Sequence, residues 1–260
     1  MINFISNVAK EAGSIILKSS KTTVRNKEHG GNIVLVSDIQ SEQYILSSIQ
    51  KKYPGHTILS EETPSSIDHL ETIANVWIVD PLDGTTNAKH EIPFYSISIA
   101  YVQYGKVIAG GIYDLLRDEF FYAEKGKGAF CNGKPIIITD ATSIDGLIIN
   151  IGSPYNQENF QLTYPFGKAF HEHGARIVNF GSSALECAWV ANGRLGAYLE
   201  AGLKSWDIAA ANLLVSEAGG VMIDPYKKNH FSIFDQKAIL VGNQKIVDVL
   251  YDVMKTYENK

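Results

Sequence analysis

The sequence has few cysteines and lacks any long run of apolar residues. Only two cysteines, Cys131 and Cys187, occur in the chain, which excludes a disulfide-stabilised scaffold and a cysteine-based zinc cluster. No apolar run reaches the roughly 20 residues that a transmembrane helix requires. The N-terminal segment also lacks the basic region and the continuous apolar stretch of a signal peptide. We therefore expect a cytoplasmic protein that does not bind membranes.

Basic residues are outnumbered, since 23 Lys and Arg stand against 28 Asp and Glu in the 260 residues. They are scattered rather than interleaved with aromatic residues in a stripe, so we expect no nucleic-acid partner. The histidines do not show the spacing of a zinc site, and His171-Glu172-His173 is better explained as the end of a surface helix. No repeat, low-complexity tract or Pro/Gly/Ser-rich linker divides the chain, whose length suits one large unit or two closely packed halves.

The apolar periodicity changes along the chain. Residues 1–20 predict an amphipathic helix, and mostly strands follow until about residue 140. Beyond that point strands alternate with helices, one of which is predicted over 160–173, and this alternation favours a partly parallel sheet. We expect an N-terminal metal- and phosphate-binding half, residues 1–140, and a C-terminal α/β half, residues 141–260, that completes the site in one compact unit.

The most informative stretch begins at Trp77. Apolar residues 77–79 predict a buried strand that leads into Asp80 and Asp83, with Pro81 between them. Because Pro81 disfavours a helix and favours a turn after the strand, both carboxylates and the Leu82 carbonyl can converge on one cation. Hard divalent cations such as Mg²⁺ prefer these oxygen ligands. Taken alone, the two acids fit a plain turn with Asp80 as a helix cap at least as well.

Three further segments strengthen the metal interpretation. Gly84, Thr85 and Thr86 follow at once and can open a helix, whose free N–H groups bind phosphate readily. Glu61 follows an apolar strand and can add a metal ligand and a base for a water, although an acidic pair at this place is more often a solvated surface pair. Asp207 begins an apolar helix of small residues, which would present it at an internal junction. A plain N-cap is the ordinary alternative for Asp207.

Together these segments resemble the signature segments of the inositol monophosphatase family of Mg²⁺-dependent, lithium-sensitive phosphatases. The matching stretches are 61–62, 80–87 and 206–211, in the family's order, and residues 126–133 resemble a family hairpin. The similarity spans essentially the full length. It implies an α/β (α+β) fold with layers α-β-α-β-α, an antiparallel sheet in the N-terminal half and a mixed, partly parallel sheet in the C-terminal half. It also implies a homodimer.

The resemblance further implies a role for each matching residue. The ligands of two or three Mg²⁺ ions would be Glu61, Asp80, the Leu82 carbonyl, Asp83 and Asp207. The catalytic residues would be Glu61, Thr85 and Asp83, with Glu61 and Thr85 orienting a metal-bound water. Residues near an outer metal ion would be Asp38 and Lys27. Phosphate would be bound by Gly84, Thr85 and Thr86, and the rest of the substrate by Asp83, Gly181, Ser182, Ser183, Glu200 and Asp207.

The implied function is hydrolysis of inositol monophosphate to inositol and phosphate by a metal-activated water. A wider superfamily shares the segment around Asp80, so fructose-1,6-bisphosphate, NADP(H) and 3′-phosphoadenosine 5′-phosphate are alternative substrates. Glu200 favours a polyol hydroxyl over a second phosphate. A non-catalytic phosphate-binding homologue is a weaker alternative, because no ligand carboxylate is lost. Ala88 departs from the family, which commonly has an aromatic residue there, and predicts altered support for the metal loop or room for a larger substrate.

Overall fold

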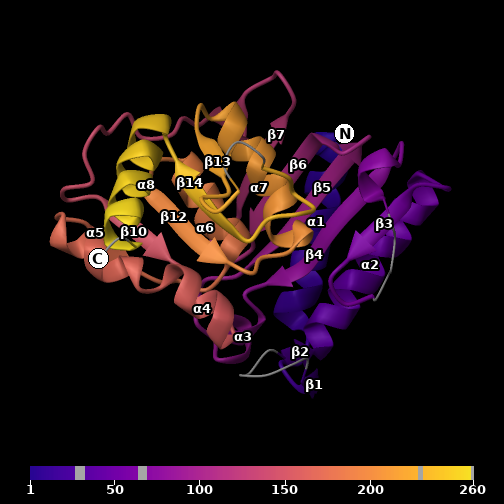
Figure 1. Ribbon diagram of the computed structural model, residues 1–260. Coiled ribbons are helices and arrows are strands. Elements are labelled where there is room, and N and C mark those ends of the chain that lie inside the picture. The colour runs from indigo at the N-terminus through magenta and orange to yellow at the C-terminus, as the bar shows by residue number, and fades with distance from the viewer. Residues whose placement is uncertain (27–32, 64–68, 228–230, 259–260) are drawn as a thin grey trace.

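The protein is described by a computed structural model that covers residues 1–26, 33–63, 69–227 and 231–258. Its elements stack in the layers α-β-α-β-α (Figure 1), as the sequence predicts. The first layer contains α1 (Ile2–Lys18) and α2 (Val36–Lys52). A small antiparallel pair, β1 (Thr23–Asn26) and β2 (Ile33–Leu35), lies at the start of α2.

The second layer is a seven-stranded sheet in the order β3-β4-β5-β6-β7-β8-β9. Its strands are β3 (Thr57–Ser60), β4 (Val76–Asp83), β5 (Ser96–Gln103), β6 (Lys106–Asp114), β7 (Glu119–Glu124), β8 (Ala129–Cys131) and β9 (Lys134–Pro135). Neighbouring strands are antiparallel except β3 and β4, which are parallel. The short helices η1 (Leu70–Thr72) and α3 (Thr85–Lys89) lie before and after β4.

The remaining layers come from the C-terminal part of the chain. The five-stranded sheet has the order β11-β10-β12-β14-β13, with β10 (Ile148–Ile151), β11 (Arg176–Val178), β12 (Ala197–Ala201), β13 (Val221–Ile223) and β14 (Ala238–Gly242). β10 runs parallel to β11 and β12, and the other pairs are antiparallel, so the sheet is mixed. The helices are α4 (Gln157–Thr163), α5 (Phe166–Glu172), α6 (Ser183–Ala191), α7 (Ser205–Glu217) and α8 (Gln244–Glu258).

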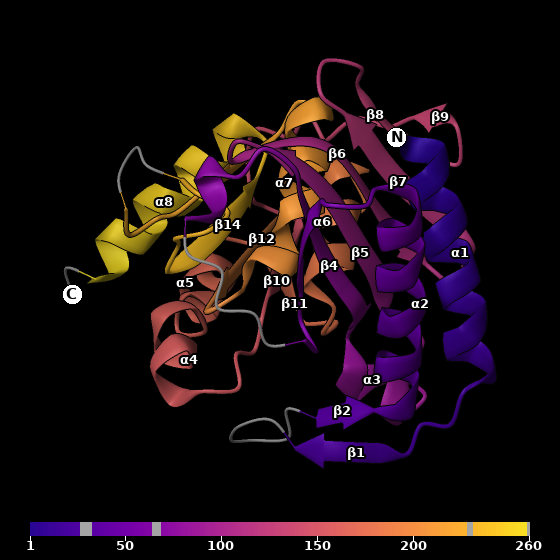
Figure 2. The same ribbon diagram turned by 90° about the vertical axis from the view of Figure 1, so that its right-hand side faces the viewer.

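The alternation of side chains along β4 shows how the layers are held together. Trp77 and Val79 belong to the apolar cluster that joins the seven-stranded sheet to α1 and α2. Figure 2 shows these two helices side by side along that sheet. Val76 and Ile78 point to the opposite face and belong to the cluster with α6 and α7, which continues into the five-stranded sheet. A third cluster packs α5 and α8 on the far side. The helices α6 and α7 therefore form the middle layer.

One predicted element is wrong in detail. The sequence predicts a single helix over 160–173, but α4 ends at Thr163 and α5 begins at Phe166. Pro165 lies between them, and proline cannot donate the backbone hydrogen bond that a continuous helix requires. Within the described ranges, no helix is both long enough and apolar enough to cross a membrane.

Candidate functional site

The strand β4 continues beyond the point where the sequence predicts a turn. Asp80 pairs with Ser98 of β5 and Asp83 with Ser96, so β4 advances three residues while β5 advances two. The extra residue forms a β-bulge, which contains Pro81, a residue that has no N–H to donate to the ladder. A regular strand would place residues three apart on opposite faces. The predicted turn is therefore wrong, and the bulge brings both carboxylates to one face.

Asp207 approaches the same face from the middle layer. It lies in the first turn of α7, and its carboxylate accepts a hydrogen bond from the Lys204 N–H at 2.6 Å. The helix packs closely on the seven-stranded sheet because Gly110 of β6 has no side chain. A Cβ atom at Gly110 would meet the Cα atom of Ala210 at 2.9 Å. This close packing is what allows Asp207 to reach the carboxylates of β4.

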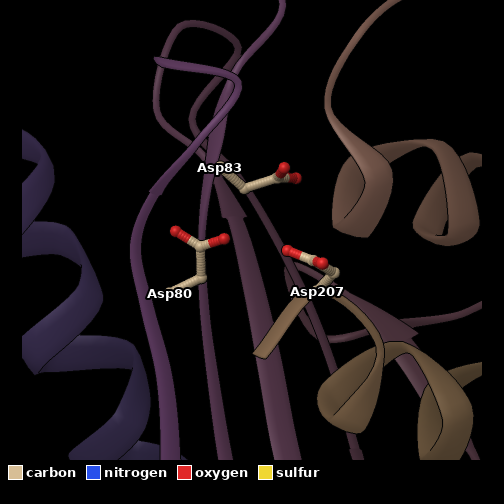
Figure 3. A group of neighbouring side chains, drawn as sticks. All are labelled: Asp80, Asp83 and Asp207. Atoms are coloured by element: carbon tan, nitrogen blue, oxygen red, sulfur yellow. The ribbon is translucent and has the colours of Figure 1, made fainter. Parts of the chain in front are cut away.

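Asp80, Asp83 and Asp207 point toward one another (Figure 3). One carboxylate oxygen of each lies within 4.8 Å of the others. Burial raises the pKa of all three carboxyl groups, and the nearby charges of Glu61 and Asp83 raise the pKa of Asp80 and Asp207 further. Buried carboxylates this close repel one another unless protons or a cation lie among them. Oxygen ligands at this spacing fit a hard divalent cation.

The start of α6 holds the carboxylate of Asp83. Its Oδ2 atom accepts hydrogen bonds from the Ser182 hydroxyl at 2.5 Å and the Ala184 N–H at 2.8 Å, and Oδ1 accepts one from the Ser183 N–H at 3.1 Å. These bonds favour the charged form and oppose the increase in pKa that burial causes. The sequence predicts that Ser182 contacts the substrate, but its side chain is buried and donates to Asp83 instead.

Glu61 lies at the end of β3, beside the end of β4. Its N–H donates to the Val79 carbonyl at 3.2 Å. Because β3 and β4 are parallel, their C-terminal ends meet at one edge of the sheet, which places Glu61 near Asp80. The Glu61 charge contributes to the raised pKa of both Asp80 and Asp207. Glu61 therefore extends the carboxylate group to a third segment of the chain.

Thr85 connects two other predicted site residues. Its hydroxyl lies 2.9 Å from Oδ1 of Asp38, on α2, and 2.9 Å from the Leu82 carbonyl oxygen. One hydroxyl proton can serve only one of these acceptors at a time. Asp38 is fully buried and also accepts the Leu35 N–H at 3.3 Å. Its proposed neighbour Lys27 lies outside the described residues, so the outer-metal role of this pair stays a prediction.

The turn between β4 and α3 depends on glycine. Gly84 has a φ of +91°, in the left-handed region that glycine adopts most readily. A Cβ atom there would meet the Tyr95 Cβ atom at 3.0 Å and the Gly181 carbonyl oxygen at 3.1 Å. Thr85 and Thr86 then begin α3, where the first N–H groups of a helix lack partners within the helix. The turn thus presents backbone donors next to the carboxylates.

Asn87 ties this turn to the C-terminal part of the chain. Its amide donates to the Phe94 carbonyl at 2.7 Å and to the Phe180 carbonyl at 2.6 Å. Ala88, the departure from the family pattern, is buried in the cluster beneath α1 and α2. Asn87 therefore supports the turn through hydrogen bonds. It lies next to Ala88, whose departure from the family pattern predicts altered support for the metal loop.

These residues line one cleft of about 510 Å³, a volume typical of small-molecule sites. The sequence-predicted residues in its wall are Glu61, Asp80, Leu82, Asp83, Gly84, Thr85, Thr86, Gly181, Ser183, Glu200 and Asp207. Asp38 and Ser182 are buried behind the wall and contact it through Thr85 and Asp83. The cleft thus collects residues from both sheets and from α3, α6 and α7.

Two buried glutamates line the cleft on the side of the five-stranded sheet. Glu200 of β12 accepts hydrogen bonds from the Ser183 hydroxyl at 3.2 Å and from the Tyr198 hydroxyl. Burial, followed by the charge of Glu186, raises the pKa of Glu200 to about 8. Burial also raises the pKa of Glu186 to about 7, although its carboxylate accepts the Gly181 N–H at 2.7 Å. This end of the cleft is rich in carboxyl groups.

Sequence reasoning missed Glu186 and Tyr155. Glu186 lies in the first turn of α6 and accepts the N–H groups of Phe180 and Gly181. The N-cap is Ser182, so Glu186 is not at the spacing of a capping box and no local pattern marks it. Tyr155 lies on the loop between β10 and α4, and its hydroxyl is 3.1 Å from the Thr86 hydroxyl. No local pattern marks Tyr155, because its position near Thr86 depends on how the two halves of the chain pack.

Comparison with known proteins gives a consistent result. A model described as "Inositol monophosphatase family" matches residues 1–255. The Nus factor SuhB of Salmonella typhimurium is 36% identical over 261 residues, which cover 98% of this chain and 96% of that protein. The inositol monophosphatase of Dictyostelium discoideum is 35% identical over 251 residues, 94% of this chain and 91% of that protein.

A solved structure agrees with both relatives. The extragenic suppressor protein suhB from Bartonella henselae matches with a TM-score of 0.89 and 32% identity, covering 98% of each chain. The similarity therefore extends over the layered fold and almost the whole sequence. Because the relatives carry different names, they identify a family and its phosphatase chemistry rather than one substrate. The chain belongs to the inositol monophosphatase family.

Proposed function

We propose that the protein is a Mg²⁺-dependent phosphomonoesterase that hydrolyses inositol monophosphate to inositol and phosphate. The observation that carries this proposal is the convergence of Asp80, Asp83 and Asp207 in a cleft beside the turn at Gly84. Family membership supports the phosphatase chemistry. The inositol monophosphatases among the relatives, from Dictyostelium discoideum and Homo sapiens, support the choice of substrate.

Five groups would supply oxygen ligands to two or three Mg²⁺ ions. They are the carboxylates of Glu61, Asp80, Asp83 and Asp207 and the carbonyl of Leu82. Bound Mg²⁺ would neutralise the phosphate charge and lower the pKa of a coordinated water. The crowding of carboxyl groups raises the pKa of Asp80 and Asp207. If these groups ionised without a cation, their negative charges would repel a phosphate anion. Substrate binding would therefore depend on the metal.

Thr85, Asp38 and Glu61 would orient the attacking water. When Thr85 donates its proton to Asp38, the Thr85 oxygen keeps lone pairs that can accept a hydrogen bond from a water in the cleft. Asp38 is fully buried, so it would act through Thr85 rather than on the water directly. Glu61 lines the cleft and supplies a second acceptor. Little covalent work is required of the protein in such a reaction beyond positioning and electrostatics.

The two ends of the cleft suit the two parts of the substrate. At one end, Gly84 and the start of α3 offer backbone N–H groups and threonine hydroxyls to the phosphate. At the other end, Glu200 and Ser183 offer a carboxyl group and a hydroxyl to the ring hydroxyls of inositol. A second phosphate there would lie beside Glu200 and Glu186, both buried carboxyl groups. This favours a polyol monophosphate over fructose-1,6-bisphosphate, NADP(H) or 3′-phosphoadenosine 5′-phosphate.

The test is phosphate release from that panel of substrates in the presence of Mg²⁺. We expect inositol monophosphate to give the highest kcat/KM, and a clear preference for another substrate would overturn the assignment. Asp83→Asn should lower kcat/KM at least about 100-fold, since even groups outside the metal ligands cost 10–100-fold. If activity survives in Asp83→Asn, the metal assignment is wrong.

Asp224→Asn is a matched control for Asp83→Asn. Asp224 is also buried and accepts backbone N–H groups, from Tyr226 at 2.9 Å and Lys237 at 2.7 Å. It lies outside the residues that line the cleft. We expect Asp224→Asn to keep its kcat/KM, so a common loss in both variants would indicate damage to the fold rather than to the site.

Four further properties are proposed, two from the family resemblance (the homodimer and the inhibition by lithium) and two from the sequence itself. We infer a homodimer, a cytoplasmic location and inhibition by lithium, together with the division of the chain into residues 1–140 and 141–260. Sedimentation velocity, cell fractionation and the panel assay with added Li⁺ would test the first three. Limited proteolysis would test whether cleavage near residue 140 releases two halves.

A further inference from the structure

Glu42, on α2, holds the segment that carries Glu61. Its side chain is buried, with 6% exposed. Its Oε1 atom accepts hydrogen bonds from the Ser60 hydroxyl at 2.5 Å, the Glu62 N–H at 3.2 Å and the Thr63 N–H at 3.0 Å. Its Oε2 atom accepts one from the Thr63 hydroxyl at 3.0 Å. The four donors lie on both sides of Glu61.

These contacts replace the sheet where β3 ends. The last pair in the register of β3 and β4 is Ser60 with Val79, and the Glu61 N–H still reaches the Val79 carbonyl. Beyond that point the chain leaves the sheet, and backbone N–H groups that are buried require another acceptor. Glu42 supplies it for Glu62 and Thr63. One side chain thus accepts four hydrogen bonds from this stretch, which fixes it firmly.

The same face of α2 contacts the other segments of the site. Ser41 and Glu42 follow Asp38 by three and four residues, which places the three side chains on one side of the helix. Asp38 contacts the Thr85 hydroxyl, and the Ser41 hydroxyl donates to the Pro81 carbonyl at 2.8 Å. Figure 2 shows α2 running along the sheet beside α1. One face of α2 therefore contacts three segments of the site. They are the stretch around Glu61, the bulge of β4 and the start of α3 at Thr85.

Arg25 of β1 adds a weaker support to the same stretch. Its Nη2 atom lies 3.2 Å from the Glu62 carbonyl oxygen and 3.3 Å from a Glu62 carboxylate oxygen. The Arg25 side chain is 52% exposed, and solvent weakens ion pairs of exposed side chains. Of these two contacts, the buried carboxylate of Glu42 is therefore the stronger restraint.

We propose that Glu42 is a positioning residue that holds Glu61 in place for Mg²⁺ binding, an inference that rests on the proposed function. Removing the Glu42 carboxylate leaves the N–H groups of Glu62 and Thr63 without this acceptor. The Glu62 hydrogen bond is buried, and an unpaired buried donor is unfavourable. The stretch would shift to find water, and the Glu61 carboxylate would shift with it. The Mg²⁺ ions would then have to order Glu61 on binding, which lowers their affinity.

The test is calorimetric titration of Mg²⁺ into the full-length wild-type, Glu42→Ala and Glu42→Gln proteins. We expect Glu42→Ala to weaken Mg²⁺ binding about tenfold or more, the range found when groups that orient metal ligands are removed. Glu42→Gln should recover part of the affinity, because its amide oxygen still accepts and its NH₂ group can donate to Thr63. In the phosphatase assay, Glu42→Ala should require more Mg²⁺ for half-maximal rate while kcat at saturating Mg²⁺ changes much less.

Glu217→Ala is the matched control. The Glu217 carboxylate also fixes a turn, through the N–H groups of Gly126 at 2.6 Å and Gly128 at 2.7 Å, but Glu217 lies outside the cleft lining. We expect its Mg²⁺ affinity to equal that of the wild type. An equal loss in Glu217→Ala and Glu42→Ala would overturn the positioning role, because it would indicate a general effect on folding.

The remaining outcomes separate this inference from the proposed function. Unchanged Mg²⁺ affinity in Glu42→Ala overturns the role of Glu42 while leaving a Mg²⁺-dependent phosphatase in place. A wild-type protein that binds no Mg²⁺ or hydrolyses no phosphomonoester overturns the proposed function instead. If Glu42→Ala does not fold, Ser60→Ala removes one donor to the same carboxylate. Unchanged affinity in both Ser60→Ala and Glu42→Gln would then overturn the inference.

Discussion

Glu200 makes the stability of the metal-free protein depend on pH. Its carboxyl group is 8% exposed, and burial followed by the charge of Glu186 raises its pKa from 4.5 to about 8. The folded state therefore keeps a proton that the unfolded state releases above pH 4.5. The contribution of the Glu200 carboxyl group to stability is fully present below pH 4.5 and is lost as the pH rises toward 8.

The magnitude follows from the two pKa values. Between pH 5 and pH 7 the carboxyl group is ionised in the unfolded state and mostly protonated in the folded state. Each pH unit therefore lowers the free energy of unfolding by up to about 1.4 kcal/mol. The free energy of unfolding should fall by about 2.5 kcal/mol over this interval from Glu200. Glu200→Gln cannot titrate and should not show this part of the decrease. Its altered hydrogen bonds with Tyr198 and Ser183 add an offset that does not depend on pH.

The measurement is urea unfolding of the wild type and Glu200→Gln in excess chelator at pH 5, 6 and 7. The difference in unfolding free energy between the two proteins should change by about 2.5 kcal/mol in favour of Glu200→Gln as the pH rises. Using the difference removes the titration of groups whose pKa the substitution leaves unchanged. Glu186, whose charge acts on Glu200, titrates together with it and contributes to the measured change. A difference that stays constant with pH would show that Glu200 ionises normally in the folded state and would refute the reasoning.

Two other perturbations test the metal site and the packing that builds it. Excess chelator should abolish phosphate release and Mg²⁺ should restore it, since the clustered carboxylates repel phosphate without a cation; full activity in chelator would contradict the proposal. Mg²⁺ at 100 times its Kd should also raise the unfolding free energy by about 2.7 kcal/mol. Gly110→Ala should lower the unfolding free energy by about 1–3 kcal/mol, because its Cβ atom would meet Ala210 Cα at 2.9 Å. The substitution should also weaken Mg²⁺ binding by displacing Asp207. If the Gly110→Ala protein is as stable as the wild type in chemical denaturation, this account is refuted.

The layered fold was predictable because the pattern of apolar residues is regular in most elements. The strand before Asp80 and the N-terminal helix are clear from periodicity alone, and the family resemblance supplies the arrangement of the elements. The helix over 160–173 was predicted as continuous because its apolar spacing is continuous, yet Pro165 divides it. The division near residue 140 stays a prediction, and one apolar cluster contains residues from both sides of it.

The site was predictable only as far as local patterns reach. Asp80, Asp83 and Thr85 lie in one motif, but the bulge that aligns the two carboxylates depends on pairing with β5. The placement of Ser182 behind Asp83 depends on α6 meeting the end of β4. Nothing in the sequence around Glu42 links it to Glu61, because their contact requires α2 to lie against the end of β3.

The described contacts also explain why these acids can be buried together. The Asp83 carboxylate is held by the start of α6, Thr85 by the buried Asp38 of α2, and the stretch around Glu61 by Glu42. Each of these contacts joins segments that are distant in the sequence, so the cleft exists only when the layers are assembled. Burial then raises the pKa of the acids, which disfavours folding above their ordinary pKa values. A divalent cation that binds only the folded arrangement would reverse that penalty, so metal binding and close packing of the layers should reinforce each other.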